Sequence, residues 1–174
     1  MELLEVMKKR HSIRKYTGEK VSEENVTKIL QAGLLAASGK AIRPWEFIVV
    51  KEKTMLEKMA QSRIVGAKML EGADCAIVVL GDEDKTDVWV EDCSVAMANM
   101  HLMADSLGVG SCWIQGRLRE AEEGKTTESY LRECLGFPEN LRLEAILSLG
   151  MPAEEKAAYT ENDLLMDKVH WEKF

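Results

Sequence analysis

A short basic segment near the N-terminus has the side chains to bind an anion. Arg10-His11-Ser12-Ile13-Arg14 places two guanidinium groups, a hydroxyl and an imidazole within five residues. In an extended chain, side chains alternate between two sides, so Arg10, Ser12 and Arg14 would project together. The forked donors of arginine suit a phosphate. The other interpretation is a solvated basic turn paired with surface carboxylates, and spacing alone favours it.

A second candidate is the loop that contains Ser38, Gly39, Lys40 and Arg43. It could bring backbone donors and two cations to a ligand, and Gly39 would allow the ligand to approach the backbone closely. The alternative is a plain connection between a helix and a strand, with Trp45 packed in the core. Taken by itself, the loop favours this alternative.

A third candidate is the strand that carries Trp113, Ile114 and Gln115, just after Gly108-Val109-Gly110. The expected order here is helix, glycines, strand, whereas a dinucleotide fingerprint needs strand, glycines, helix. A Rossmann NAD site is therefore not expected. P-loop, zincin and serine-hydrolase motifs do not occur in the sequence. The three histidines are scattered, so no metal site is expected, and no residue is predicted to be catalytic.

The composition describes one ordinary folded domain over residues 1–174. Apolar residues make up 46% and charged residues 30% of the chain, and the net charge is −7. That charge disfavours nucleic acid and anionic membranes as partners. The N-terminus lacks the apolar region of a signal peptide, and no apolar run is long enough to span a membrane. The four cysteines lie far apart, which predicts buried free thiols and a cytoplasmic location.

Apolar spacing predicts helices that alternate with single strands, and hence an α/β or α+β sheet covered by helices. Ser22 is expected to cap the second helix and Asp92 to cap a long helix that ends near Leu107. That long helix is apolar around much of its circumference, so it should be central or lie in a subunit interface. The expected strands are 47–50, 76–80, 112–114 and 145–149. A first helix is expected before Arg10, where Leu3, Val6 and Met7 share a helical face, and the other expected helices lie near residues 55–61 and 129–135.

The three candidate segments, taken together with others, resemble the FMN-dependent nitroreductase family. Residues 10–16 are similar to its opening R-[RH]-S-x-R-x-[FY], and residues 38–47 to its P-S-x-x-N-x-Q-P-W-x-F loop. Residues 107–114 resemble L-G-L-G-[ST]-C-W-I, residues 149–156 resemble L-G-Y-P-A-E-E-K, and the closing residues 169–174 resemble V-H-[YW]-E-K-[WF]. The loop departs from the pattern at Ala37, Ala41 and Arg43. The resemblance covers nearly the whole chain in the right order.

The resemblance implies an α+β fold with a central, mostly antiparallel sheet flanked by helices, in an intertwined homodimer. It implies FMN at the dimer interface, with contacts from both chains. Arg10, Ser12 and Arg14 correspond to residues that hold the phosphate and ribityl chain, and His11 lies at a position that often contacts them. Ser38, Gly39, Lys40 and Arg43 match the loop that the partner brings to the flavin. Trp113, Ile114 and Gln115 match the segment beside the ring, and Lys156 matches a residue that closes over the phosphate.

The implied activity is the reduction of nitro, quinone or related small acceptors by NAD(P)H, in a ping-pong reaction. The flavin would carry the electrons while the protein binds and orients it, so no protein nucleophile is required. Two alternatives stay open at this point. One is a different redox reaction on the same fold, such as dehalogenation or dehydrogenation, and the other is a flavin-binding protein without physiological turnover.

Overall fold

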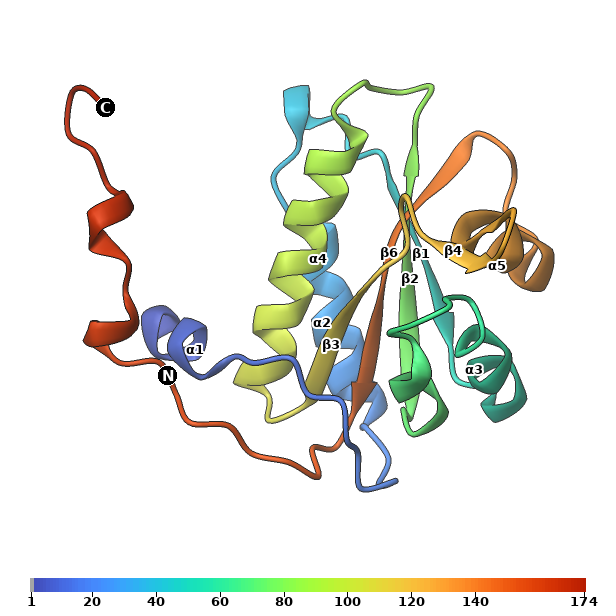
Figure 1. Cartoon of the computed structure of the whole chain (residues 1–174), viewed down its shortest axis with the longest axis horizontal. Helices are drawn as coiled ribbons and strands as arrows, with labels where there is room; N and C mark the ends of the chain where they lie inside the picture. Colours follow the sequence, from blue (N-terminus) through green and yellow to red (C-terminus); the bar gives the residue numbers. More distant parts are fainter. Residues whose placement is uncertain (1) are drawn as a thin grey trace.

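A four-stranded sheet lies between two layers of helices (Figure 1). The computed structural model describes residues 2–174. Its helices and strands follow one another in the order α1 (Leu3–Lys9), α2 (Glu23–Leu34), η1 (Gly39–Ala41), β1 (Trp45–Val50), α3 (Lys53–Met59), η2 (Lys68–Glu71), β2 (Cys75–Asp82), α4 (Trp89–Ser106), β3 (Gly110–Gln115), β4 (Glu120–Glu122), β5 (Lys125–Thr126), α5 (Thr127–Leu135), β6 (Leu141–Gly150), η3 (Glu161–Asp163) and η4 (Met166–Lys168).

The strand order is β1-β2-β6-β3, and every neighbouring pair is antiparallel. All eight residues of β2 are buried, because helices cover both faces of this central strand. The continuous apolar runs in the sequence reflect this burial on two faces. The antiparallel pairing resolves the alternative between α/β and α+β, and it confirms the predicted α+β fold. The four predicted strands are all present, each longer by two to five residues than expected.

The two faces of the sheet build two cores. Along β2, Ile77 and Val79 pack toward α2 and α4, whereas Val78 and Leu80 pack toward α3 and α5. This separation follows from the alternation of side chains along a strand. Trp45 is buried in the first core, as the simple reading of its loop predicts.

The two predicted helix caps have different outcomes. Ser22 caps α2, since its hydroxyl accepts a hydrogen bond from the Asn25 amide. The prediction for Asp92 is wrong: α4 begins at Trp89 with Val88 as its N-cap, and the Asp92 amide already bonds to the Val88 carbonyl. Asp92 is buried inside the first turn, so its carboxylate is directed to a contact outside the helix.

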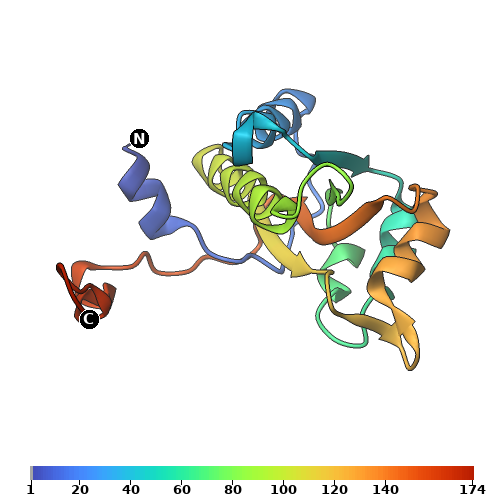
Figure 2. The same cartoon turned by 90° about the horizontal axis from the view of Figure 1, so that it is seen from above.

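Two arms leave the helices and sheet. Helix α1 and the C-terminal segment 155–174 lie side by side at one edge of the molecule, where α1 also contacts α4 (Figures 1 and 2). A backbone bond from the Tyr159 amide to the Lys8 carbonyl, 3.0 Å long, joins them. Every residue from 155 onward is exposed. The apolar side chains on this C-terminal arm therefore have no cover within the part of the chain described.

The cysteine prediction is confirmed for the thiol state. All four cysteines are free, and Cys75, Cys93 and Cys112 are buried, while Cys134 is half-buried. Within residues 2–174, no helix has both the length and the apolar content to cross a membrane.

Candidate flavin site

The basic N-terminal segment docks on the open edge of β3. Ser12 forms a parallel bridge with Ser111, and the Ile13 amide donates to the Ser111 carbonyl at 2.9 Å. On the other side, the segment after β6 follows the same stretch, where the Thr17 amide donates to the Met151 carbonyl at 2.9 Å. The backbone of residues 12–17 is therefore fixed between two parts of the chain that are distant in sequence.

Two glycines make room for this docking. Gly110 and Gly150 face each other across β3 and β6. A Cβ on Gly110 would lie 2.9 Å from a methyl carbon of Ile13, and one on Gly150 would lie 2.7 Å from the Tyr16 ring. Glycine lets the N-terminal segment approach this closely. Gly110 was part of a motif noted in the sequence, and packing is the role that the structure gives it.

Two cations from two segments meet at this edge. The Lys156 ammonium donates to the Ser12 carbonyl at 2.8 Å, and an Arg14 guanidinium nitrogen lies 3.5 Å from the same oxygen. Burial raises the pKa of the Cys112 thiol, whereas nearby Arg14 and Lys156 act in the opposite direction. Within residues 2–174, neither these two side chains nor Arg10 forms an ion pair with a carboxylate. The side chains are thus not paired with carboxylates, but Arg14 and Lys156 are exposed, and the Glu154 carboxylate accepts the Arg14 amide at 2.7 Å, as in a solvated basic turn.

Arg10 is held by a histidine on α4. Its guanidinium lies 3.0 Å from Nε2 of His101, whose other ring nitrogen contacts the Ser111 hydroxyl. His101 is 7% exposed, and burial, with the charge of Arg10, lowers its pKa to about 4. The sequence showed only a lone histidine on an apolar helix, so this contact gave no signal there.

His11 contacts the C-terminal arm. Its Nε2 lies 2.9 Å from the Ala157 carbonyl, and its ring lies 4.8 Å from the ring of Tyr159, centroid to centroid. Because a carbonyl only accepts hydrogen bonds, Nε2 must carry the proton. In this structure His11 therefore anchors the arm.

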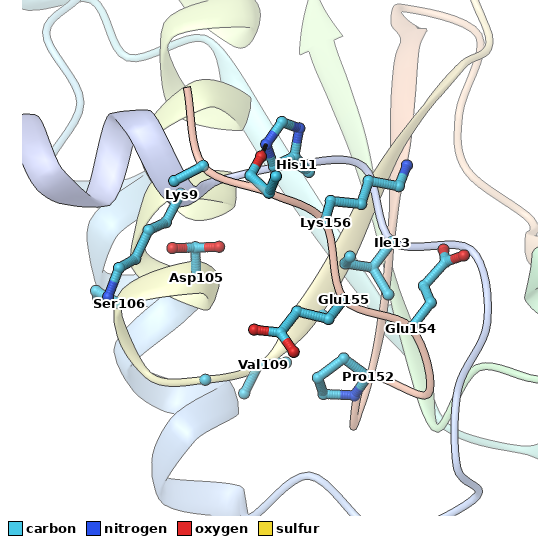
Figure 3. A pocket seen from close by; sticks show the side chains of 14 residues that line it. Lys9, His11, Ile13, Asp105, Ser106, Val109, Pro152, Glu154, Glu155 and Lys156 are labelled. Atoms are coloured by element: carbon cyan, nitrogen blue, oxygen red, sulfur yellow. Dashed lines mark hydrogen bonds between the residues drawn. The ribbon is translucent and has the colours of Figure 1, made fainter. Parts of the chain in front are cut away.

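A hollow of about 430 Å³ lies on the side of the segment that carries Lys9, His11 and Ile13 (Figure 3). Arg10, Ser12 and Arg14 alternate with these residues and do not line it. Its lining includes three carboxylates and two lysines: Asp105, Glu154, Glu155, Lys9 and Lys156. Three carboxylates disfavour a phosphate, so the hollow is not where Arg10, Ser12 and Arg14 would hold one.

The loop at residues 38–43 has a strained backbone. Lys40, Ala41 and Arg43 have φ values of 52°, 57° and 54°, in the left-handed region that residues with a Cβ avoid. The Ser38 hydroxyl accepts the Arg43 amide at 3.0 Å and so braces the loop from within. Such strain persists only where the surroundings impose it, and it is common at functional sites.

Asp92 is the external anchor of this loop. Its Oδ1 accepts the Gly39 amide at 2.8 Å, and its Oδ2 is buried with no hydrogen-bond partner within residues 2–174. Asp92 and Gly39 are 53 residues apart, which is why sequence spacing assigned Asp92 to a helix cap instead.

The three predicted ring-side residues on β3 are divided by the strand's alternation. The Trp113 indole donates to the Gln115 side chain at 2.9 Å, so these two share a face. Ile114 is 1% exposed and packs into the core beneath α3 and α5, on the opposite face. Its side chain therefore cannot reach a ligand, although its backbone lies on the strand.

The predicted site residues thus form two groups. Arg14 and Lys156 meet at the Ser12 carbonyl, and Arg10 lies against His101 beside Ser111, near the C-terminal end of α4. The loop at 38–43 lies at the other end of that helix, as Figure 1 shows for η1. The structure does not bring these two groups together within one chain.

Comparison with known proteins identifies the family. The sequence profile of the Nitroreductase family matches residues 7–65 and 56–151. A protein of Archaeoglobus fulgidus with the provisional name NADH dehydrogenase/NAD(P)H nitroreductase is 42% identical over 178 residues, which covers 99% of both chains. This chain therefore belongs to the nitroreductase family, and the predicted resemblance is confirmed.

Solved structures agree with the fold. An FMN-dependent nitroreductase from Clostridium difficile R20291 is 45% identical, with a TM-score of 0.96 over 98% of this chain and 99% of that one. A nitroreductase with bound FMN from Bacteroides fragilis NCTC 9343 is 28% identical, with a TM-score of 0.77 over 99% of this chain and 100% of that one. The prediction of a nitroreductase-like oxidoreductase is thus confirmed at the level of the family.

Proposed function

We propose that this protein binds FMN and uses NAD(P)H to reduce small oxidised acceptors such as nitro compounds and quinones, in a ping-pong reaction. The observation that carries the proposal is the placement of Arg14 and Lys156 at the Ser12 carbonyl and of Arg10 beside Ser111, in a protein of net charge −7. None of these three side chains forms an ion pair among residues 2–174. The names of the relatives add to this, since several are FMN-dependent or bind FMN.

The residues present fit the phosphate end of FMN. Two guanidinium groups, one ammonium and the Ser12 hydroxyl are the donors that bind phosphate best, and guanidinium can do so with two bonds at once. The backbone of Ser12 and Arg14 is already fixed between β3 and the segment after β6, so little ordering of this stretch is needed when the phosphate binds. When bound, FMN supplies the hydride and electron transfer.

The chain's own residues would then orient the cofactor. Trp113 and Gln115 present a flat side chain and an amide on one face of β3, with the amide oriented by the indole. Ile114 would contribute through its backbone only. None of these residues needs to act as acid, base or nucleophile, so we propose that the protein's contribution is binding, orientation and exclusion of water.

We propose that the working form is a homodimer in which the loop at 38–43 serves the flavin of the partner. Within one chain, this loop and the basic segment lie at opposite ends of α4. If two copies pack with their α4 helices antiparallel across a two-fold axis, each loop comes to the basic segment of the other copy. Lys40 and Arg43, both exposed, would then be available to that site.

Exposed apolar surface supports this assembly. Val95 is 41% exposed on α4, and an apolar groove of about 440 Å³ between α1, α2 and α4 is lined by Leu35 and Leu102 among others. On the C-terminal arm, Trp171 is 83% exposed. Exposed apolar surface is typical of interaction sites.

Val95→Glu should yield monomers with little FMN, whereas Val49→Glu, on the edge strand β1, should leave the assembly intact. A V95E monomer with full FMN content would contradict the partner loop.

The proposed compartment is the cytoplasm. All four cysteines are free, which is typical of proteins in a reducing compartment.

The central experiment is anaerobic reduction. Protein loaded with FMN is mixed with NADH or NADPH, and absorbance is followed at about 450 nm, the flavin band. Rapid bleaching, followed by return of the colour when a quinone or nitro compound is added, is the expected result. A stable yellow colour with both nicotinamides would contradict the enzyme and favour a flavin carrier.

The binding site has its own control. Arg10→Ala combined with Arg14→Ala should give folded but colourless protein, because two charge-assisted contacts to phosphate are lost. Lys15→Ala combined with Lys20→Ala removes the same charge nearby and should keep the colour. Equal FMN content in both proteins would place the phosphate elsewhere.

A further inference from the structure

A buried histidine contacts Arg10, one of the proposed phosphate ligands. His101 lies on α4, 7% exposed, between the Arg10 guanidinium and the Ser111 hydroxyl. Within residues 2–174, the bond to His101 at 3.0 Å is the one hydrogen bond that the Arg10 guanidinium makes. Its remaining N–H groups stay available to a ligand.

The partners of His101 fix its protonation state. A guanidinium can only donate hydrogen bonds, so Nε2 must accept from Arg10. The proton of the neutral ring is then on Nδ1, which donates to the Ser111 hydroxyl. Burial and the charge of Arg10 lower the pKa of His101 to about 4, which agrees with a neutral ring at neutral pH.

We infer that His101 is a positioning residue, which holds the Arg10 guanidinium in place for the flavin phosphate without neutralising its charge. This inference rests on the proposed function. A carboxylate at the same place would also hold Arg10, but it would cancel the positive charge that the phosphate needs. A neutral imidazole supplies the contact and leaves the charge intact.

Ser111 links the side chain of His101 to the backbone of the basic segment. Its hydroxyl contacts His101, which holds Arg10, and its carbonyl accepts the Ile13 amide at 2.9 Å, which fixes the backbone beside Ser12. Ser111, at the start of β3, thus helps to fix the positions of two proposed phosphate ligands, Arg10 and Ser12. A shift of His101 would move Arg10 relative to Ser12.

The surrounding charges are consistent with this role. Asp105 lies one turn further along α4, where burial raises its pKa and the charge of Arg10 lowers it. No hydrogen bond or ion pair between Arg10 and Asp105 occurs among the described residues. The direct contact to Arg10 is therefore made by the neutral ring and not by the carboxylate.

The test compares FMN with riboflavin, which lacks the phosphate. Apoprotein is titrated with each flavin, and quenching of flavin fluorescence gives the two dissociation constants. His101→Leu removes both hydrogen bonds and should weaken FMN binding about tenfold while leaving riboflavin binding unchanged. His101→Gln, whose amide can accept from Arg10 and donate to Ser111, should stay within about threefold of the wild type.

Arg10→Ala provides the control for mechanism. If His101 acts through Arg10, adding H101L to R10A should weaken FMN binding no further. Circular dichroism and urea unfolding at neutral pH verify that each variant is folded. An H101L protein that loses FMN and riboflavin affinity equally has a general packing defect, and that result would overturn the positioning role.

The two proposals fail in different ways. A wild-type protein that binds FMN no more tightly than riboflavin would overturn the phosphate site, and the role of His101 with it. A wild type that discriminates between the flavins, together with an H101L variant that discriminates equally well, would overturn the role of His101 alone.

Discussion

Each end of α4 carries a buried side chain that anchors a neighbouring segment, but the two anchors differ in charge. Near its N-terminal end, the buried carboxylate of Asp92 holds the backbone of the loop at Gly39. Near its C-terminal end, the neutral ring of His101 holds the cationic side chain of Arg10. The two anchors are nine residues apart, or about 13 Å along the helix. A charged anchor suits a backbone amide, whereas a neutral anchor is required where the positive charge must remain for a ligand.

The two ends differ in backbone strain as well. The loop has three residues other than glycine at positive φ, whereas the basic segment has none. The segment is held by backbone hydrogen bonds on both sides, and the loop chiefly by Asp92 and its own Ser38. We therefore expect the basic segment to be the rigid side of the site and the loop the adjustable side.

The largest expected effect is a loss of stability in acid that depends on His101. Its pKa is lowered from 6.5 to about 4 in the folded protein. Below pH 6.5 the unfolded chain therefore binds a proton that the folded chain resists, so stability falls between pH 6.5 and 4, by about 3 kcal/mol in total. Urea unfolding at several pH values should show this fall.

The H101Q variant should show a flatter profile over the same range. Arg10 and Asp105 are retained in that variant, so the difference between the two profiles isolates the imidazole. Parallel profiles for the two proteins would mean that His101 is not buried in the neutral form.

A methyl group on Gly150 should disrupt the packing of the basic segment against the sheet. Its Cβ would lie 2.7 Å from the Tyr16 ring, so the ring and the segment it packs against must move. Gly150→Ala should cost about 2 kcal/mol of stability and weaken FMN binding. Gly72→Ala is the matched control, because its Cβ would lie 3.9 Å from the same ring, at an ordinary contact distance. Equal melting temperatures for G150A and G72A would contradict the close fit.

Loss of the other anchor should affect the loop alone. Asp92→Ala leaves the Gly39 amide without its acceptor and should cost about 1 kcal/mol. Asp92 contacts the loop backbone and none of the proposed phosphate ligands. Any loss of affinity should therefore be similar for FMN and riboflavin, and the preference for FMN should remain close to that of the wild type. Asp92→Asn keeps an acceptor oxygen and should restore most of the lost stability, as measured by urea unfolding. A D92A protein with the FMN defect of R10A would show that the two ends are not independent.

The smallest expected effect is relief of strain in the loop. Ala41 has a φ of 57°, which glycine adopts at no steric cost. Ala41→Gly should change stability by about +0.5 kcal/mol, since relief of strain is partly offset by the greater freedom of glycine in the unfolded chain. Ala37→Gly, at a neighbouring exposed position without positive φ, should instead be neutral or destabilising. A lower melting temperature for A41G than for A37G would argue against strain at Ala41.

The helices and strands could be predicted from the sequence because residues that are buried in the core recur at regular spacings along each element. Four apolar runs marked the four strands of the sheet, and Ser22 before two glutamates marked the start of α2. The roles of Asp92 and His101 were not predictable in this way. Each depends on a contact with a residue more than fifty positions away, and neither contact changes the local pattern.

The arm at 155–174 illustrates a different limit. Its motif near Lys156 was recognisable, but its apolar residues follow no helical or strand period, because no surface of the same chain covers them. The spacing of apolar residues therefore indicates burial against the same chain, but it does not indicate burial against a second chain. The placement of Arg10, Ser12 and Arg14 opposite the side of His11, in contrast, followed from simple alternation.

The exposed arm also allows the oligomeric state to be followed by limited proteolysis. Lys168 and Lys173 lie on it and are accessible to trypsin in a single chain. Cleavage there should slow as protein concentration rises, if a second copy covers the arm. The fraction of this segment that resists digestion would then measure, without any chromophore, the fraction of the protein that is dimeric at a given concentration.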